Sequence, residues 1–93
     1  MRRTYYLYTF DSTHAAIAAQ RLLKETDAAL MPTLRAITAS CGMSLRISCE
    51  NVDRARALMA ASDIDAALYT LYRVEQEDGG IRCEKVPEKD RQG

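Results

Sequence analysis

The sequence is poor in the residues and patterns that mark several large classes of protein. It has no tryptophan and one histidine among 93 residues, and its 13 basic side chains are balanced by 13 acidic ones. A nucleic-acid-binding module concentrates positive charge on one face, so a net charge of zero argues against that function. With a single histidine and no two cysteines separated by two residues, neither a metal site nor a cofactor is expected.

Long apolar segments are also missing. No run approaches the roughly 18 residues that span a bilayer, and the first residues lack the apolar core of a signal peptide. Three cysteines, an odd number, do not match the paired framework of a small secreted protein. These absences predict a soluble cytoplasmic protein that does not associate with a membrane, in which thiols stay reduced.

What the chain does contain is enough apolar material for one small domain. Hydrophobic residues make up 47% of the sequence, as in an ordinary globular protein. We expect a single α+β domain over residues 1–86, followed by a disordered, charged tail over 87–93. Because small domains bury a modest share of their surface, a sheet face left without helices would favour a homodimer.

Local patterns predict strands alternating with helices. Residues 4–10 are almost all β-branched or aromatic, so both faces of this strand are expected to be covered. Apolar stripes with helical spacing follow over residues 15–23 and 52–59. Further strands are predicted over residues 28–32, 43–49 and 66–75, with a hairpin return over 81–86.

The resulting order, β-α-β-β-α-β, is that of a ferredoxin-like sandwich. It predicts a four-stranded antiparallel sheet with two helices on one face, to which the C-terminal hairpin can add a fifth strand. This fold hosts many unrelated functions, so function has to be argued from individual residues.

The tyrosines cluster in two of the predicted strands. Together they indicate an aromatic sheet face, for which ordinary strand packing is the simpler interpretation and a dimer interface the alternative. They are Tyr5, Tyr6, Tyr8, Tyr69 and Tyr72.

Two of the cysteines have unexceptional predicted places. Cys49 has the same parity as Leu45 and Ile47 in the alternating strand, so we expect it in the core. Cys83 falls in the hairpin return, at an exposed or edge position. An intrastrand pair of Cys41 and Cys49 is excluded, because eight extended residues span roughly 26 Å.

Cys41 differs from the other two, because it lies where a loop meets the third strand. Gly42 leaves the sulfur side open, Ser40 and Thr38 can donate hydrogen bonds, and amides beside a glycine can stabilise an anion. These features favour a reactive thiolate or a persulfide. Cys41 also shares the parity of Met43, however, so an early strand start would turn it into the core; the residues alone leave both orientations open.

Three charged or titratable residues could assist this thiol. Arg35 and Arg46 are near enough in sequence to stabilise a thiolate if the loop folds over the strand. His14, on the first turn of the first helix, could act as a base toward the thiol, although such a histidine more often caps or packs.

Residues 31–46, with Pro-Thr-Leu-Arg before Ser-Cys-Gly, resemble a small bacterial family of selenium or sulfur carrier-like proteins. The similarity extends over residues 5–74 and includes Ser-Thr-His at 12–14 and Leu-Leu-Lys at 22–24. The chain departs from the family pattern at Leu34, where a second proline is usual, and at Thr38 and Ala39, where serines are usual.

The resemblance implies a carrier rather than a complete enzyme. Cys41 would hold sulfur or selenium as a persulfide or perselenide, received from a cysteine-desulfurase-like donor protein and passed to an acceptor protein. Ser40 and the amides near Gly42 would hold the anion, Arg35 would tune its charge, and His14 would be an optional helper.

Two alternatives to the carrier hypothesis involve no thiol chemistry. One is a dimeric module that binds a small anion through the loop of residues 33–44. The candidate anion-binding residues are Thr33, Arg35, Thr38, Ser40 and Gly42 of that loop, with Arg46 just beyond it. The other is a structural domain that binds a protein partner with its sheet face, in which Cys41 is unreactive.

Overall fold

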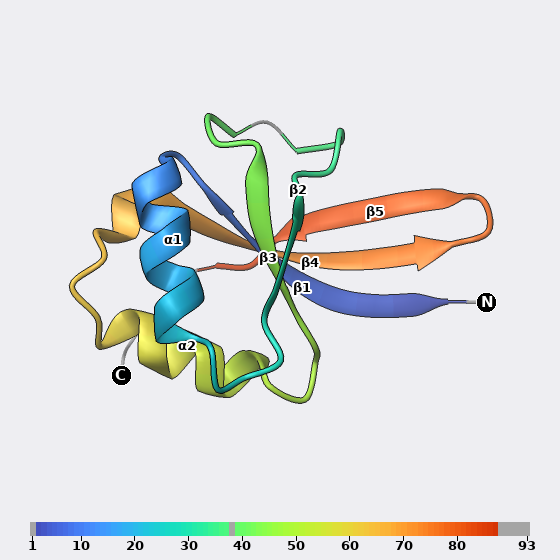
Figure 1. Ribbon diagram of the computed structural model, residues 1–93. Coiled ribbons are helices and arrows are strands. Elements are labelled where there is room, and N and C mark those ends of the chain that lie inside the picture. Colours follow the sequence, from blue (N-terminus) through green and yellow to red (C-terminus); the bar gives the residue numbers. More distant parts are fainter. Residues whose placement is uncertain (1, 38, 88–93) are drawn as a thin grey trace.

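The computed structural model describes residues 2–37 and 39–87 (Figure 1). The tail predicted over 87–93 therefore lies, beyond Pro87, outside the described residues. In chain order the elements are β1 (Arg3–Phe10), α1 (Thr13–Leu22), β2 (Ala29–Pro32), β3 (Met43–Ile47), α2 (Val52–Ala60), the short 3-10 helix η1 (Ala66–Leu68), β4 (Tyr69–Glu77) and β5 (Gly80–Lys85).

The strands form one antiparallel sheet in the order β2-β3-β1-β4-β5. The predicted α+β class is confirmed. In the part of the chain described, the sheet has five strands rather than the basic four, and the fifth is the strand that the C-terminal hairpin was expected to be able to add. The added strand, β5, pairs with β4 from Tyr72 opposite Lys85 to Glu77 opposite Gly80. The hairpin closes because Gly80 has a φ of 151°, a conformation that residues with a Cβ rarely adopt.

Both helices lie on the same face of the sheet and form the larger core with it (Figure 1). α1 covers most of the predicted apolar stripe over residues 15–23 and begins after Ser12, whose hydroxyl accepts a hydrogen bond from the Ala15 N–H at 3.0 Å. The small side chains of Ala15, Ala16 and Ala19 are buried, which lets α1 approach the sheet closely. None of the helices in the described ranges is long and apolar enough to pass through a membrane.

The opposite face of the sheet is covered by the segment between β2 and β3. Ile37 from this segment packs with Tyr5 and Leu7 of β1 and Val74 of β4 in a second buried cluster. Both faces of β1 are therefore covered, as its composition predicts.

The tyrosines do not form one aromatic face; they pack on both faces of the sheet, as the simpler interpretation of ordinary strand packing expects. Tyr8 is buried on the helix side, where Tyr6 and Tyr69 pack against the same core. Tyr5 is buried on the other side, with Tyr72 against it. The split follows from the alternation of side chains along each strand.

Cys49 is exposed, which corrects the prediction that it belongs to the core. β3 ends at Ile47, and the chain then turns, with the Asn51 N–H donating to the Ser48 carbonyl at 3.1 Å. The alternation of the strand therefore stops before Cys49. At the other end of β3, Met43 is also 37% exposed, so only Leu45 and Ile47 of the predicted stripe are fully buried.

Candidate functional site

Cys41 lies at the junction of β1, α1 and β3, and its residue is 5% exposed. Its N–H donates to the carbonyl of Phe10, the last residue of β1, at 3.1 Å. This bond holds the end of the β2–β3 connection beside the start of α1. The thiol thereby joins the core cluster under the helices, which decides the orientation that the residues alone leave open.

The sulfur has two polar neighbours. The Met43 N–H donates to Cys41 Sγ at 3.4 Å, and Thr13 Oγ1 lies 3.8 Å from the same atom. Thr13 is the first residue of α1, so the sulfur sits beside the amino end of a helix. Free N–H groups and the helix dipole give that end a partial positive charge, which stabilises an anion such as a thiolate.

Thr33 and Ser44 hold the backbone around Cys41 in place. The Thr33 hydroxyl donates to the Cys41 carbonyl at 3.3 Å and lies 2.7 Å from Ser44 Oγ. Because a hydroxyl has one proton, Ser44 is the donor in the second bond. The Thr33 N–H also donates to the Gly42 carbonyl at 2.9 Å, so three hydrogen bonds join Thr33 to residues 41–44.

The residues next to the buried Cys41 in the chain are at the surface. Ser40 and Gly42, on either side of Cys41, are exposed. A Cβ built at Gly42 would meet no atom within 4 Å, so the space beside this residue is open. The site is therefore a covered thiol flanked by solvent-accessible backbone.

The structure does not bring the predicted charged helpers to the sulfur. Within residues 2–37 and 39–87, no hydrogen bond or ion pair joins Cys41 to His14, Arg35 or Arg46. His14 and Arg35 are exposed, and Arg46 points to the other face of the sheet, its guanidinium carbon 5.8 Å from the Tyr5 ring centre. Thr38 lies outside the described residues.

Thr13 is the neighbour of the thiol that sequence reasoning missed. It is 28 positions from Cys41 and appears in the sequence analysis only as part of the Ser-Thr-His segment at 12–14. The one available signal was the Ser-Thr pair itself, which places two hydroxyls at the amino end of a helix.

The remaining cysteine, Cys83, lies on β5 and packs against the cluster on the face opposite the helices. Burial raises the pKa of its thiol above the ordinary value. All three cysteines are free. Since Cys41 and Cys83 belong to clusters on opposite faces of the sheet, nothing pairs them.

Comparisons with known proteins add one finding. The model of a family described as "Putative Se/S carrier protein-like" matches residues 5–69. This range runs from the middle of β1 to the start of β4 and includes the complete Cys41 site. Neither a curated protein nor a solved structure matches the chain.

Proposed function

Since the chain belongs to the Putative Se/S carrier protein-like family, we propose that it carries sulfur or selenium on the Cys41 thiol. The observation that supports this most is the pair of contacts at the sulfur. The Met43 N–H at 3.4 Å and the Thr13 hydroxyl at 3.8 Å can both stabilise negative charge on Sγ or on an atom attached to it.

The transfer is an exchange between thiols. The Cys41 thiolate attacks the outer sulfur of a donor persulfide, R–S–SH, and a new S–S bond forms at Cys41. The S–S bond of the donor breaks, its electron pair leaves on the donor thiolate, and that thiolate takes up the proton given up by the Cys41 thiol. No external oxidant is needed, and a donor R–S–SeH would deliver selenium by the same exchange.

The surroundings of Cys41 suit a carrier that protects its cargo. A persulfide is easily reduced or passed to the wrong thiol, and a sulfur that is largely covered meets fewer such thiols than an exposed one while a donor can still reach it. Exposed Ser40 and Gly42 lie on the side from which a donor would approach, and the exposed side chains of His14 and Arg35 are available to meet it. The partners would be a cysteine-desulfurase-like donor and an acceptor protein in the cytoplasm.

The direct test is mass spectrometry after incubation with a small persulfide, such as glutathione persulfide. In the wild type, we expect one added sulfur on the peptide that contains Cys41. In the Cys41→Ser variant, the corresponding peptide should carry no added sulfur. Cys49→Ser is the matched control, because Cys49 is more exposed yet lacks the two contacts, and this variant should still be modified at Cys41. Modification of Cys49 with Cys41 unchanged would overturn the assignment.

The burial of Cys41 favours a second candidate, a protein-interaction module in which this cysteine only packs. This candidate predicts that Cys41→Ala leaves partner or self-association unchanged, and that no small persulfide reacts at Cys41 under native conditions. Sedimentation of the variant and the wild type distinguishes it from a carrier when read together with the mass spectra.

A further inference from the structure

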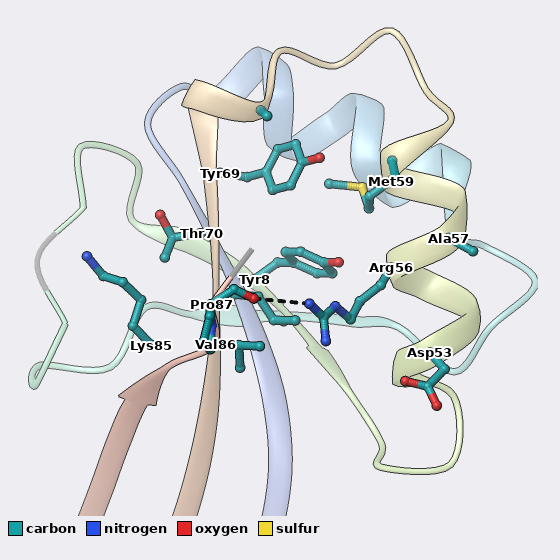
Figure 2. Close-up of a pocket in the computed structure, with 13 residues that line it drawn as sticks. Tyr8, Asp53, Arg56, Ala57, Met59, Tyr69, Thr70, Lys85, Val86 and Pro87 are labelled. Atoms are coloured by element: carbon teal, nitrogen blue, oxygen red, sulfur yellow. Dashed lines mark hydrogen bonds between the residues drawn. The ribbon is translucent and has the colours of Figure 1, made fainter. Parts of the chain in front are cut away.

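A groove of about 670 Å³ lies between α2, the neighbouring strands β1 and β4, and the segment after β5 (Figure 2). Cys41 does not line it. We call it the α2 groove; its walls include Tyr8, Arg56, Met59, Tyr69, Leu71 and Lys85. Its volume falls within the range of about 300–1,000 Å³ that is usual for small-molecule sites.

The first observation that points to a ligand is the Tyr8 side chain. Tyr8 is 2% exposed, and its hydroxyl has no hydrogen-bond partner among residues 2–37 and 39–87. Figure 2 shows this hydroxyl directed toward α2, between Met59 and Arg56. A buried hydroxyl without a partner is costly, so a group that hydrogen bonds to it from the groove would gain binding energy.

The second observation is the position of Arg56. One guanidinium nitrogen donates to the Pro87 carbonyl at 3.2 Å, which fixes the group over the groove and leaves further N–H donors available (Figure 2). Its positive charge acts on the Tyr8 hydroxyl. Burial nevertheless raises the pKa of Tyr8 well above the ordinary value, with Tyr69 adding to the shift, so the hydroxyl keeps its proton and can donate it.

The rest of the wall is mainly apolar. Tyr69 meets Tyr8 edge to face, with ring centres 5.6 Å apart, and Met59 and Leu71 continue the surface. Asp53 offsets part of the positive charge that Arg56 and Lys85 bring to the wall, which favours a ligand with one negative charge over one with several. The groove thus offers two adjacent donors for one anionic group and an apolar surface for the body that carries it.

We propose that the α2 groove binds a small organic monocarboxylate with an apolar body. The carboxylate lies between the Tyr8 hydroxyl and the Arg56 guanidinium, where both can donate to it. The aryl or alkyl body packs against Tyr69, Met59 and Leu71. This site is separate from the Cys41 site and does not depend on chalcogen transfer.

The test is a titration of the full chain with phenylacetate and with hexanoate, followed by NMR. The neutral amide phenylacetamide keeps the shape of the first probe without its charge. We expect at least one carboxylate to bind saturably, with shifts at the Met59 methyl group, and the amide to bind roughly tenfold more weakly or worse. Absence of saturable binding by both carboxylates, or equal affinity for the amide, would overturn the proposal.

Two variants place the carboxylate. Tyr8→Phe keeps the ring and removes the unpartnered hydroxyl, and it should weaken binding about tenfold while the fold is unchanged by circular dichroism. Arg56→Leu should weaken it at least as much. Arg54→Leu is the control, because Arg54 lies on the same helix but pairs with Glu25 at 3.9 Å, away from the groove. Wild-type affinity in Tyr8→Phe would contradict the proposed position.

Discussion

At the amino end of β3, Cys41 is 5% exposed and accepts a hydrogen bond from the Met43 N–H, whereas beyond its carboxyl end Cys49 is exposed and donates to the Thr4 carbonyl at 3.6 Å. Both cysteines have the same parity as Leu45 and Ile47. Both cysteines lie beside β1, and the difference arises in the backbone outside β3. The Cys41 N–H bonds to the Phe10 carbonyl and its side chain enters the core, whereas the chain turns after Ile47 and leaves the Cys49 side chain exposed. Odd or even position in a strand therefore predicts the direction of a side chain only within the regular β-strand.

The largest difference between the two cysteine positions is expected when each is replaced by lysine. Cys41→Lys puts an ammonium group in the core beside the positive amino end of α1, and we expect it to reduce the free energy of unfolding by about 3 kcal/mol or more. Cys49→Lys should change it by less than about 0.5 kcal/mol, since that position is exposed. Urea denaturation measures both, and similar losses in the two variants would show that Cys41 is not buried.

A smaller effect is expected from Thr33→Val, which removes the hydroxyl that bonds to the Cys41 carbonyl and to Ser44. Ser44 is fully buried and would lose its partner, so we expect a loss of roughly 1–3 kcal/mol in the free energy of unfolding.

The same variant should react faster with iodoacetamide at Cys41, with no change at Cys49. The matched control is Ser40→Ala, which removes an exposed hydroxyl from the same β2–β3 segment. It should leave the free energy of unfolding and the reaction rate of Cys41 nearly unchanged. An unchanged Cys41 rate in Thr33→Val would mean that these bonds do not cover the thiol.

The smallest effect concerns the turn beyond β3, where Asp27 accepts a hydrogen bond from the Ser48 N–H at 3.3 Å. Desolvation raises the pKa of Asp27, but hydrogen bonds from Ser48 and Asn51 outweigh it and hold the pKa below its ordinary value. A lowered folded-state pKa stabilises the protein above the ordinary value of 3.8, and this stabilisation is lost as the pH falls through the folded-state pKa.

Because Asp27 is exposed, its contribution should stay below about 0.5 kcal/mol. Asp27→Asn should lower the free energy of unfolding slightly at neutral pH and leave it unchanged well below pH 3.8, as measured by urea denaturation. A larger difference at acidic pH than at neutral pH would contradict the assigned sign.

Several elements could be predicted because their signals are local. The apolar stripe over residues 15–23 indicates α1, the alternation around Leu45 identifies β3, and the predicted strand over 66–75 with its hairpin return over 81–86 corresponds to β4 and β5. The core position predicted for Cys49 failed, because it depended on where β3 stops. The sequence also left open how the tyrosines divide between the two faces of the sheet, which the structure decides.

The candidate site divides in the same way. Cys41 and its flanking Ser40 and Gly42 could be selected from the sequence, as could the family to which the chain belongs. The contacts of the sulfur could not, because Thr13 and Phe10 reach it from about thirty positions away in the chain.

Residue patterns were enough to predict the α+β class, the helical stripes and strands, and the choice of Cys41 as the cysteine to test, because these depend on neighbours within a few positions. The tertiary structure alone decided that Cys41 lies under the amino end of α1 and that Arg46 points away from it. It also decided that Tyr8 and Arg56 meet in one groove. The physical reason is that packing brings together side chains whose separation along the chain carries no local signal, and only the fold sets their distances.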